Sequence, residues 1–204
     1  MIRQQTVGNG APAKVTVDGA VISDGNAGVV FDTDGGTLDV SNIEVESLTA
    51  DALVAAANGA KATLSNANIE SSSMTSITIT LTGSVQNVID TTVSSMLALE
   101  DAFLGSGTNT DVFLTRTTIQ NNALTERWRI LNVRDGAEGR ATRTTVARNT
   151  ALQFGFTASS SRSLMIIDHS FFIDNFGLDV STKPRVLIVP GYSLIVVLVF
   201  FAVL

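Results

Sequence analysis

The stretch Leu114-Thr-Arg-Thr-Thr-Ile119 decides the fold, because its two ends are apolar, lie five residues apart and recur along the chain. The pair occurs seven times, once every 23 to 27 residues. With 45% apolar residues, fourteen such matches arise by chance on the order of once in 100,000. A repeat of this length predicts a solenoid, whose coils bury their apolar faces only by stacking. The seven pairs are Val17/Ile22, Val40/Val45, Leu64/Ile69, Val88/Val93, Leu114/Ile119, Ala141/Val146 and Ile167/Phe172.

The residue types within each coil favour strands over helices. Six of the seven second positions are β-branched and the seventh is Phe172, which suits an extended backbone. A short polar segment between the paired positions predicts a strand, a corner and a second strand. Further extended runs follow at 27–31, 53–56, 77–81, 129–133 and 154–157, and only 48–57 and 94–104 offer a helical alternative. We therefore expect an all-β, right-handed, single-stranded parallel β-helix of about seven coils.

The motif from Leu114 to Asn122 returns in the coils that end at Asn149 and Asn175. Over residues 13–182 this pattern resembles the right-handed parallel β-helix of the pectin-lyase-like superfamily. The three stacked asparagines resemble the asparagine ladder of that superfamily, because Asn tolerates left-handed backbone and forms local bonds in a turn. The first four coils depart from the pattern and carry Gly25, Leu48, Ser72 and Met96 at this position.

The chain is interpreted as one elongated β-helix domain, residues 1–183, followed by an apolar tail, residues 184–204. No adequate cap is expected before Ala13. The nineteen residues from Val186 to Leu204 carry no charge and follow Lys183 and Arg185, which favours a membrane segment. The alternative is an eighth coil, because residues 185–195 align with 162–172 at a shift of 23.

The expected location follows from the two ends of the sequence. The first eight residues lack the apolar core of a secretory signal. The protein therefore either stays inside the cell or is a fragment. Proteins of the resembled superfamily are usually exported, so we favour an N-terminally truncated chain that is membrane-associated and lies at the cell surface or outside the cell. The chain has no cysteine, which excludes disulfides and thiolate metal sites.

Charge is distributed unevenly along the chain. Residues 1–110 hold 3 Lys/Arg against 12 Asp/Glu, and residues 111–204 hold 10 against 7. The arginine-rich half is predicted to attract an acidic polymer, although a solvated surface explains it as well. The overall net charge of −6 and the absence of basic tracts with aromatics argue against nucleic acid as a partner.

The best candidate site comes from stacking. Asp90, Arg116, Arg143 and His169 each follow a first apolar position by two residues, so a β-helix aligns them along one edge as a binding site. Lyases of the resembled superfamily cleave acidic polysaccharides by β-elimination. That resemblance implies His169 as the base, beside Asp168, with Arg116 and Arg143 holding a uronate carboxylate. The simpler alternative is that polar corner residues face water.

These observations favour a non-catalytic or degenerate surface module that binds a glycan, such as an acidic polysaccharide, or a surface protein. The alternative is a polysaccharide lyase or glycoside hydrolase that acts on an acidic polysaccharide. A lesser alternative is an ice-binding solenoid, suggested by the threonine pairs that begin at Thr91, Thr117 and Thr144. No cofactor, metal ion or nucleic acid is expected.

Overall fold

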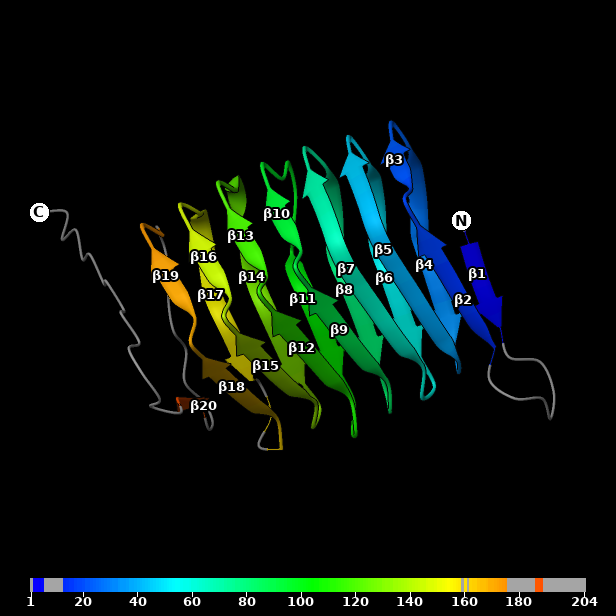
Figure 1. The fold of residues 1–204 in the computed structure, drawn as a ribbon. Helices are drawn as coiled ribbons and strands as arrows, with labels where there is room; N and C mark the ends of the chain where they lie inside the picture. Colours follow the sequence, from blue (N-terminus) through cyan, green and yellow to red (C-terminus); the bar gives the residue numbers. More distant parts are fainter. Residues whose placement is uncertain (1, 6–12, 159, 161, 176–185, 189–204) are drawn as a thin grey trace, which may run out of the picture.

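The computed structural model shows an all-β parallel solenoid of about six turns (Figure 1). It describes residues 2–5, 13–158, 160, 162–175 and 186–188. The predicted fold class is confirmed. The helical alternatives were wrong, because residues 49–57 form strand β6 and residues 101–106 form strand β11.

Two parallel sheets form the sides of the rod, and each coil contributes to both. Sheet A contains β1 (Ile2–Gln5), β4 (Asn26–Asp34), β6 (Thr49–Ala57), β8 (Ser73–Leu81), β11 (Asp101–Ser106), β14 (Ala123–Arg134) and β17 (Thr150–Ala158). Sheet B contains β2 (Lys14–Asp18), β3 (Val21–Ser23), β5 (Thr37–Glu46), β7 (Lys61–Glu70), β9 (Val85–Ile89), β10 (Thr92–Ser94), β12 (Asp111–Thr115), β13 (Thr118–Gln120), β15 (Glu138–Thr142), β16 (Thr145–Ala147), β18 (Leu164–Asp168), β19 (Phe171–Ile173) and β20 (Val186–Ile188).

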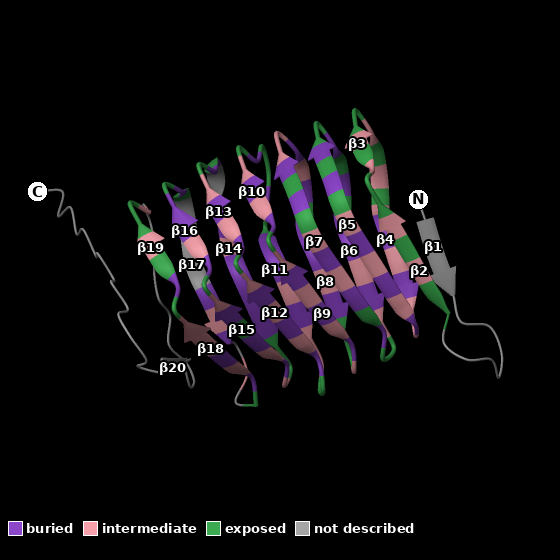
Figure 2. Ribbon diagram, in the orientation of Figure 1, coloured by how far each residue is buried: buried purple, intermediate pink, exposed green. Residues whose placement is uncertain are grey.

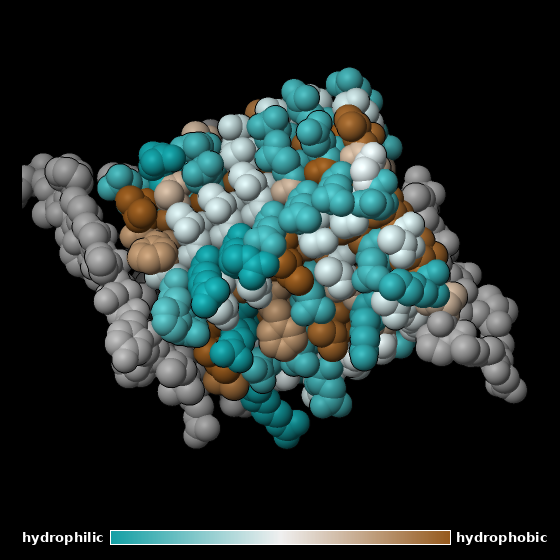
Figure 3. All heavy atoms as spheres, in the orientation of Figure 1, coloured by the Kyte–Doolittle hydropathy of each residue, from teal (hydrophilic) through white to brown (hydrophobic). Residues whose placement is uncertain are grey.

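The apolar pairs stack in register, as the repeat predicts. Val93 lies between Ile69 and Ile119, and Leu114 lies between Val88 and Ala141. The five middle pairs are almost fully buried, whereas the first and last pairs are only partly buried because each lies in an outer coil (Figure 2). The surface seen in Figure 3 is mostly hydrophilic or neutral, with small apolar areas.

The ends of the rod differ from the expectation. The seven pairs mark seven levels of sheet B, and the described residues form about six turns. Strand β1 extends sheet A by pairing with β4, which the polar sequence of Ile2–Gln5 did not reveal.

Only a small part of the predicted apolar tail is described. Strand β20 pairs with β18 and sets Val186 opposite Met165, a shift of 21 residues where the sequence alignment had 23. The rest of residues 184–204 lies outside the described part of the chain. Within that part, no helix is long and apolar enough to cross a membrane.

The asparagine ladder is present, but its chemistry differs from the expectation. Asn122 and Asn149 are buried and bond to neighbouring coils: the Asn149 amide oxygen accepts from Asn122 Nδ2 at 2.9 Å, and Asn149 Nδ2 donates to the Ile119 carbonyl at 3.0 Å. The left-handed backbone falls one residue earlier, at Asn121 and Arg148. The ladder residues therefore satisfy buried backbone groups between coils.

Candidate functional site

The predicted edge exists as a stacked column at the corner of sheet B. This corner column consists of Gly19, Asn42, Asn66, Asp90, Arg116, Arg143 and His169. Each residue has a positive φ, between 47° and 70°, so the backbone is left-handed at every corner. Gly, Asn, Asp and His adopt this conformation comparatively often, whereas for Arg it is uncommon. This uncommon backbone is a reason to examine the column for function.

One of the corner arginines, Arg116, forms an ion pair with Asp90 in the preceding coil. Arg116 Nε and Nη2 donate to the two carboxylate oxygens of Asp90, each at 2.6 Å. Both side chains are partly exposed, at 49% for Arg116 and 39% for Asp90. This bidentate pair engages Nε and Nη2 of the guanidinium, and the role of Arg116 in holding a uronate carboxylate stays a prediction.

The other two predicted residues lie in the next coils. The Arg143 backbone N–H donates to the Asp168 carbonyl at 3.0 Å, and His169 Nδ1 lies 2.5 Å from Asp168 Oδ1. Asp168, His169 and Arg143 are therefore neighbours, as the stacking predicted. Among the described residues, no side-chain bond is recorded for the Arg143 guanidinium. The roles of these residues in binding or catalysis stay predictions.

The Asp90–Arg116 pair predicts a specific dependence of stability on pH. The guanidinium lowers the pKa of Asp90 through its hydrogen bonds. A lowered pKa in the folded state stabilises the protein above the unfolded-state pKa of about 3.9, and this contribution is lost as pH falls through the folded-state pKa.

We therefore expect Asp90→Asn to be less stable than the native chain at pH 7, and the difference to shrink below about pH 4. Urea unfolding midpoints measured from pH 7 to pH 3 test this. Asp24→Asn, in an exposed turn, is the control. A difference that stays constant over the whole range contradicts the prediction.

The threonine pairs do not form a doubled outward ladder. Thr91, Thr117 and Thr144 are buried, while the threonine after each is only partly exposed. Their hydroxyls face backbone carbonyls, as in the 3.1 Å bond from Thr91 Oγ1 to the Ile89 carbonyl. One threonine of each pair is thus buried, and the row that remains for the ice-binding alternative consists of Thr92, Thr118 and Thr145; that alternative stays a prediction.

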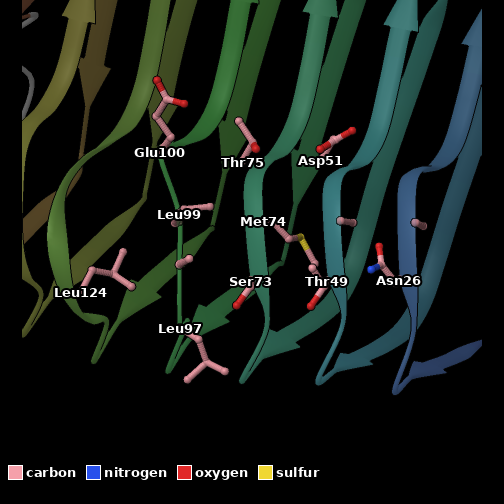
Figure 4. A pocket seen from close by; sticks show the side chains of 13 residues that line it. Asn26, Thr49, Asp51, Ser73, Met74, Thr75, Leu97, Leu99, Glu100 and Leu124 are labelled. Atoms are coloured by element: carbon pink, nitrogen blue, oxygen red, sulfur yellow. The ribbon is translucent and has the colours of Figure 1, made fainter.

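A groove with a volume of about 600 Å³ lies on sheet A (Figure 4). It crosses β4, β6, β8, the segment before β11 and the start of β14. We call it the sheet A groove. Its lining residues are Asn26, Ala27, Thr49, Ala50, Asp51, Ser73, Met74, Thr75, Leu97, Ala98, Leu99, Glu100 and Leu124.

Two rows of exposed or half-buried, mainly polar side chains line the groove. One row contains Asp51, Thr75 and Glu100, and Figure 4 shows these side chains in line. The other contains Asn26, Thr49 and Ser73 and continues at Ala98, which pairs with Ser73; the exposed Leu97 lies next to it. Between the rows the strands place Ala50, Met74 and Leu99, whose side chains are 3% to 7% exposed and belong to the core.

Local irregularities in the strands shape this region. A regular strand alternates buried and exposed residues, but β6 buries three in succession, Ala52, Leu53 and Val54. Strand β14 also carries a bulge: it takes five steps from Ala123 to Trp128 where β17 takes two from Thr150 to Leu152. Bulges bend a sheet and re-aim side chains, so the groove ends at the coil with the extra residues.

A buried polar network adjoins the groove. Asp101 follows Glu100 and its side chain is 7% exposed, and both of its oxygens accept hydrogen bonds from Arg129. Asn132 Nδ2 also donates to Asp101 Oδ2 at 3.2 Å. Glu100 Oε1 lies 3.6 Å from Arg129 Nη2, which makes a weaker contact. The network fixes the backbone at the end of the polar row.

The predicted residues and the groove occupy different places. Asp90, Arg116, Arg143 and His169 lie on the corner column of sheet B, and none of them lines the sheet A groove. The repeat predicted the column because its residues share one register. It did not predict the groove, because the groove depends on strand bending and on inserted residues that break the repeat.

Metal-ligand geometry and similarity to known proteins add little to the description of the groove and the corner column. Within the described residues, no group of three His, Cys, Asp or Glu side chains is placed to hold a metal ion. No family model, curated protein or solved structure matches the chain. The groove and the corner column are therefore interpreted from their own residues.

Proposed function

We propose that the protein is a non-catalytic binding module that holds an extended glycan chain in the sheet A groove. The observation that carries the proposal is the pair of polar rows across neighbouring coils, with the exposed Leu97 beside one of them. A sugar ring has polar edges and apolar C–H faces. Hydroxyl, amide and carboxylate groups of the two rows complement the polar edges, and Leu97 offers an apolar contact for a ring face.

The location of the groove favours a glycan over a peptide. It crosses the middle of sheet A, where the strands pair on both sides and their backbone groups are already hydrogen-bonded. A peptide therefore finds no free strand edge to extend. The groove repeats at the strand spacing of about 4.8 Å, close to the advance per sugar unit, whereas an extended peptide repeats after two residues, about 6.6 Å.

The same geometry favours binding over cleavage. The candidate catalytic residues, His169, Arg143 and Arg116, lie on the other sheet and away from the groove. Arg116 is already paired with Asp90. A degenerate member of the pectin-lyase-like superfamily fits this arrangement, and the lyase or hydrolase alternative stays a prediction, as does membrane association through the tail.

Filling the groove tests the proposal. Thr49 is an exposed member of one polar row, so Thr49→Trp is expected to fill the space without disturbing the core. We expect the native chain to bind at least one oligosaccharide of a neutral, acidic and amino-sugar panel, measured by calorimetry. Thr49→Trp should weaken that binding at least tenfold.

Thr16→Trp provides the matched control, because Thr16 is equally exposed but lies on β2 of sheet B. Circular dichroism checks that both variants fold. Equal binding by both variants, or binding of peptides but of no oligosaccharide, would overturn the proposal. New reducing ends or unsaturated products, lost in His169→Ala, would establish the enzymatic alternative in its place.

A further inference from the structure

The charged residues that line the sheet A groove are all negative. Among its thirteen lining residues, Asp51 and Glu100 are charged, and both carry carboxylates. The contact of Glu100 with Arg129 is long, at 3.6 Å, and Arg129 is engaged by Asp101 with both ends of its guanidinium. One cation therefore faces two carboxylates there, and Asp51 adds another. The polar row keeps a net negative charge.

The spacing of the two carboxylates is set by the coils. Asp51 pairs with the level of Thr75 in the next coil, and the Glu100 backbone N–H donates to the Thr75 carbonyl at 3.1 Å. Asp51 and Glu100 are thus two coils apart, which is roughly 10 Å at the strand spacing. A chain that advances by one sugar per coil places alternate units beside the two carboxylates.

We propose that the ligand of the groove is a glycan whose sugars carry free amines, such as a β-1,4-linked glucosamine chain. This inference rests on the proposed function and adds the charge class of the ligand. The protonated amines of two alternate sugars pair with Asp51 and Glu100, while ring hydroxyls meet Thr75, Thr49 and Ser73. An acidic polysaccharide, the partner expected from the sequence, is repelled by the same row.

The test compares oligosaccharides that share a backbone and differ in charge. A glucosamine hexamer, its N-acetylated counterpart and a galacturonate hexamer are titrated into the full chain at mildly acidic pH, where the amines are protonated. Exposed ion pairs are individually weak, so we expect the amine form to bind about five- to twentyfold more tightly than the N-acetylated form. This advantage should disappear at about 1 M salt.

Two double variants distinguish binding at a specific site from attraction by the net charge of the protein. Asp51→Asn/Glu100→Gln should remove most of the five- to twentyfold preference for the amine form. Glu44→Gln/Glu46→Gln changes the net charge equally but on exposed positions of sheet B, and should have little effect.

The outcomes distinguish this inference from the proposed function. Equal binding of the amine and N-acetylated forms, both lost in Thr49→Trp, overturns the charge class and keeps the glycan groove. Stronger binding of the galacturonate hexamer than of the glucosamine hexamer also overturns the charge class and keeps the glycan groove. Equal losses in the two double variants show net-charge attraction and overturn the inference. If no hexamer binds and Thr49→Trp changes nothing, the proposed function fails as well.

Discussion

Ile119→Asp is expected to prevent the rod from folding. Ile119 is fully buried and stacks between Val93 and Val146 in neighbouring coils. A carboxylate there has no described cation beside it, and it also replaces a large apolar side chain. The combined cost is at least about 5 kcal/mol, which is comparable to the whole stability of a typical domain.

Far-ultraviolet circular dichroism and urea unfolding measure this effect. Gln120→Glu is the matched control, because Gln120 is adjacent in β13, half-buried and polar. The control should keep the strand spectrum and an unfolding midpoint close to that of the native chain. A cooperative midpoint for Ile119→Asp near the native value would contradict the stacked core.

Arg129→Met is expected to be the second most damaging change, at about 3 kcal/mol. It removes the cation from Asp101, whose side chain is 7% exposed and cannot recover its hydration. The remaining hydrogen bond from Asn132 does not neutralise the charge. Removal of one partner of a buried pair costs more than removal of both, because the charge that stays behind is uncompensated.

A double-mutant cycle checks that explanation. Asp101→Leu/Arg129→Met should recover a large part of the stability that Arg129→Met loses. Arg134→Met is the control, since Arg134 is exposed and its contact with Asp135 is 3.8 Å long. If the double variant is no more stable than Arg129→Met, packing by the arginine stem explains the loss, and the ion pair does not.

The sequence predicted those parts of the fold that repeat in every coil. The apolar pairs fixed which residues of sheet B face the core, and the shared register placed Arg143 beside His169. The strands of sheet A were harder to predict, because they bury consecutive residues such as Leu53 and Val54. Hydrophobic periodicity alone does not identify the buried residues of a strand that bends.

The candidate site was likewise predictable only in part. The corner column was predictable as a row of polar residues, but not the left-handed backbone at Arg116 and Arg143, which is unusual for arginine. Asp51 and Glu100 gave no signal, because they belong to coils of different length and align only in space. A comparison of coil lengths would have marked the three long coils, from 88 to 167, as different from the shorter coils before them.

The pairing of each strand only with the coils before and after it also determines how the rod comes apart. In the described sheets, every register joins neighbouring coils, and no strand bridges distant ones. Stability in such a structure is a sum of local interfaces, as in a one-dimensional lattice. The outer coils have one neighbour and open first, while the middle coils around Leu64 and Leu114 exchange their amide hydrogens last.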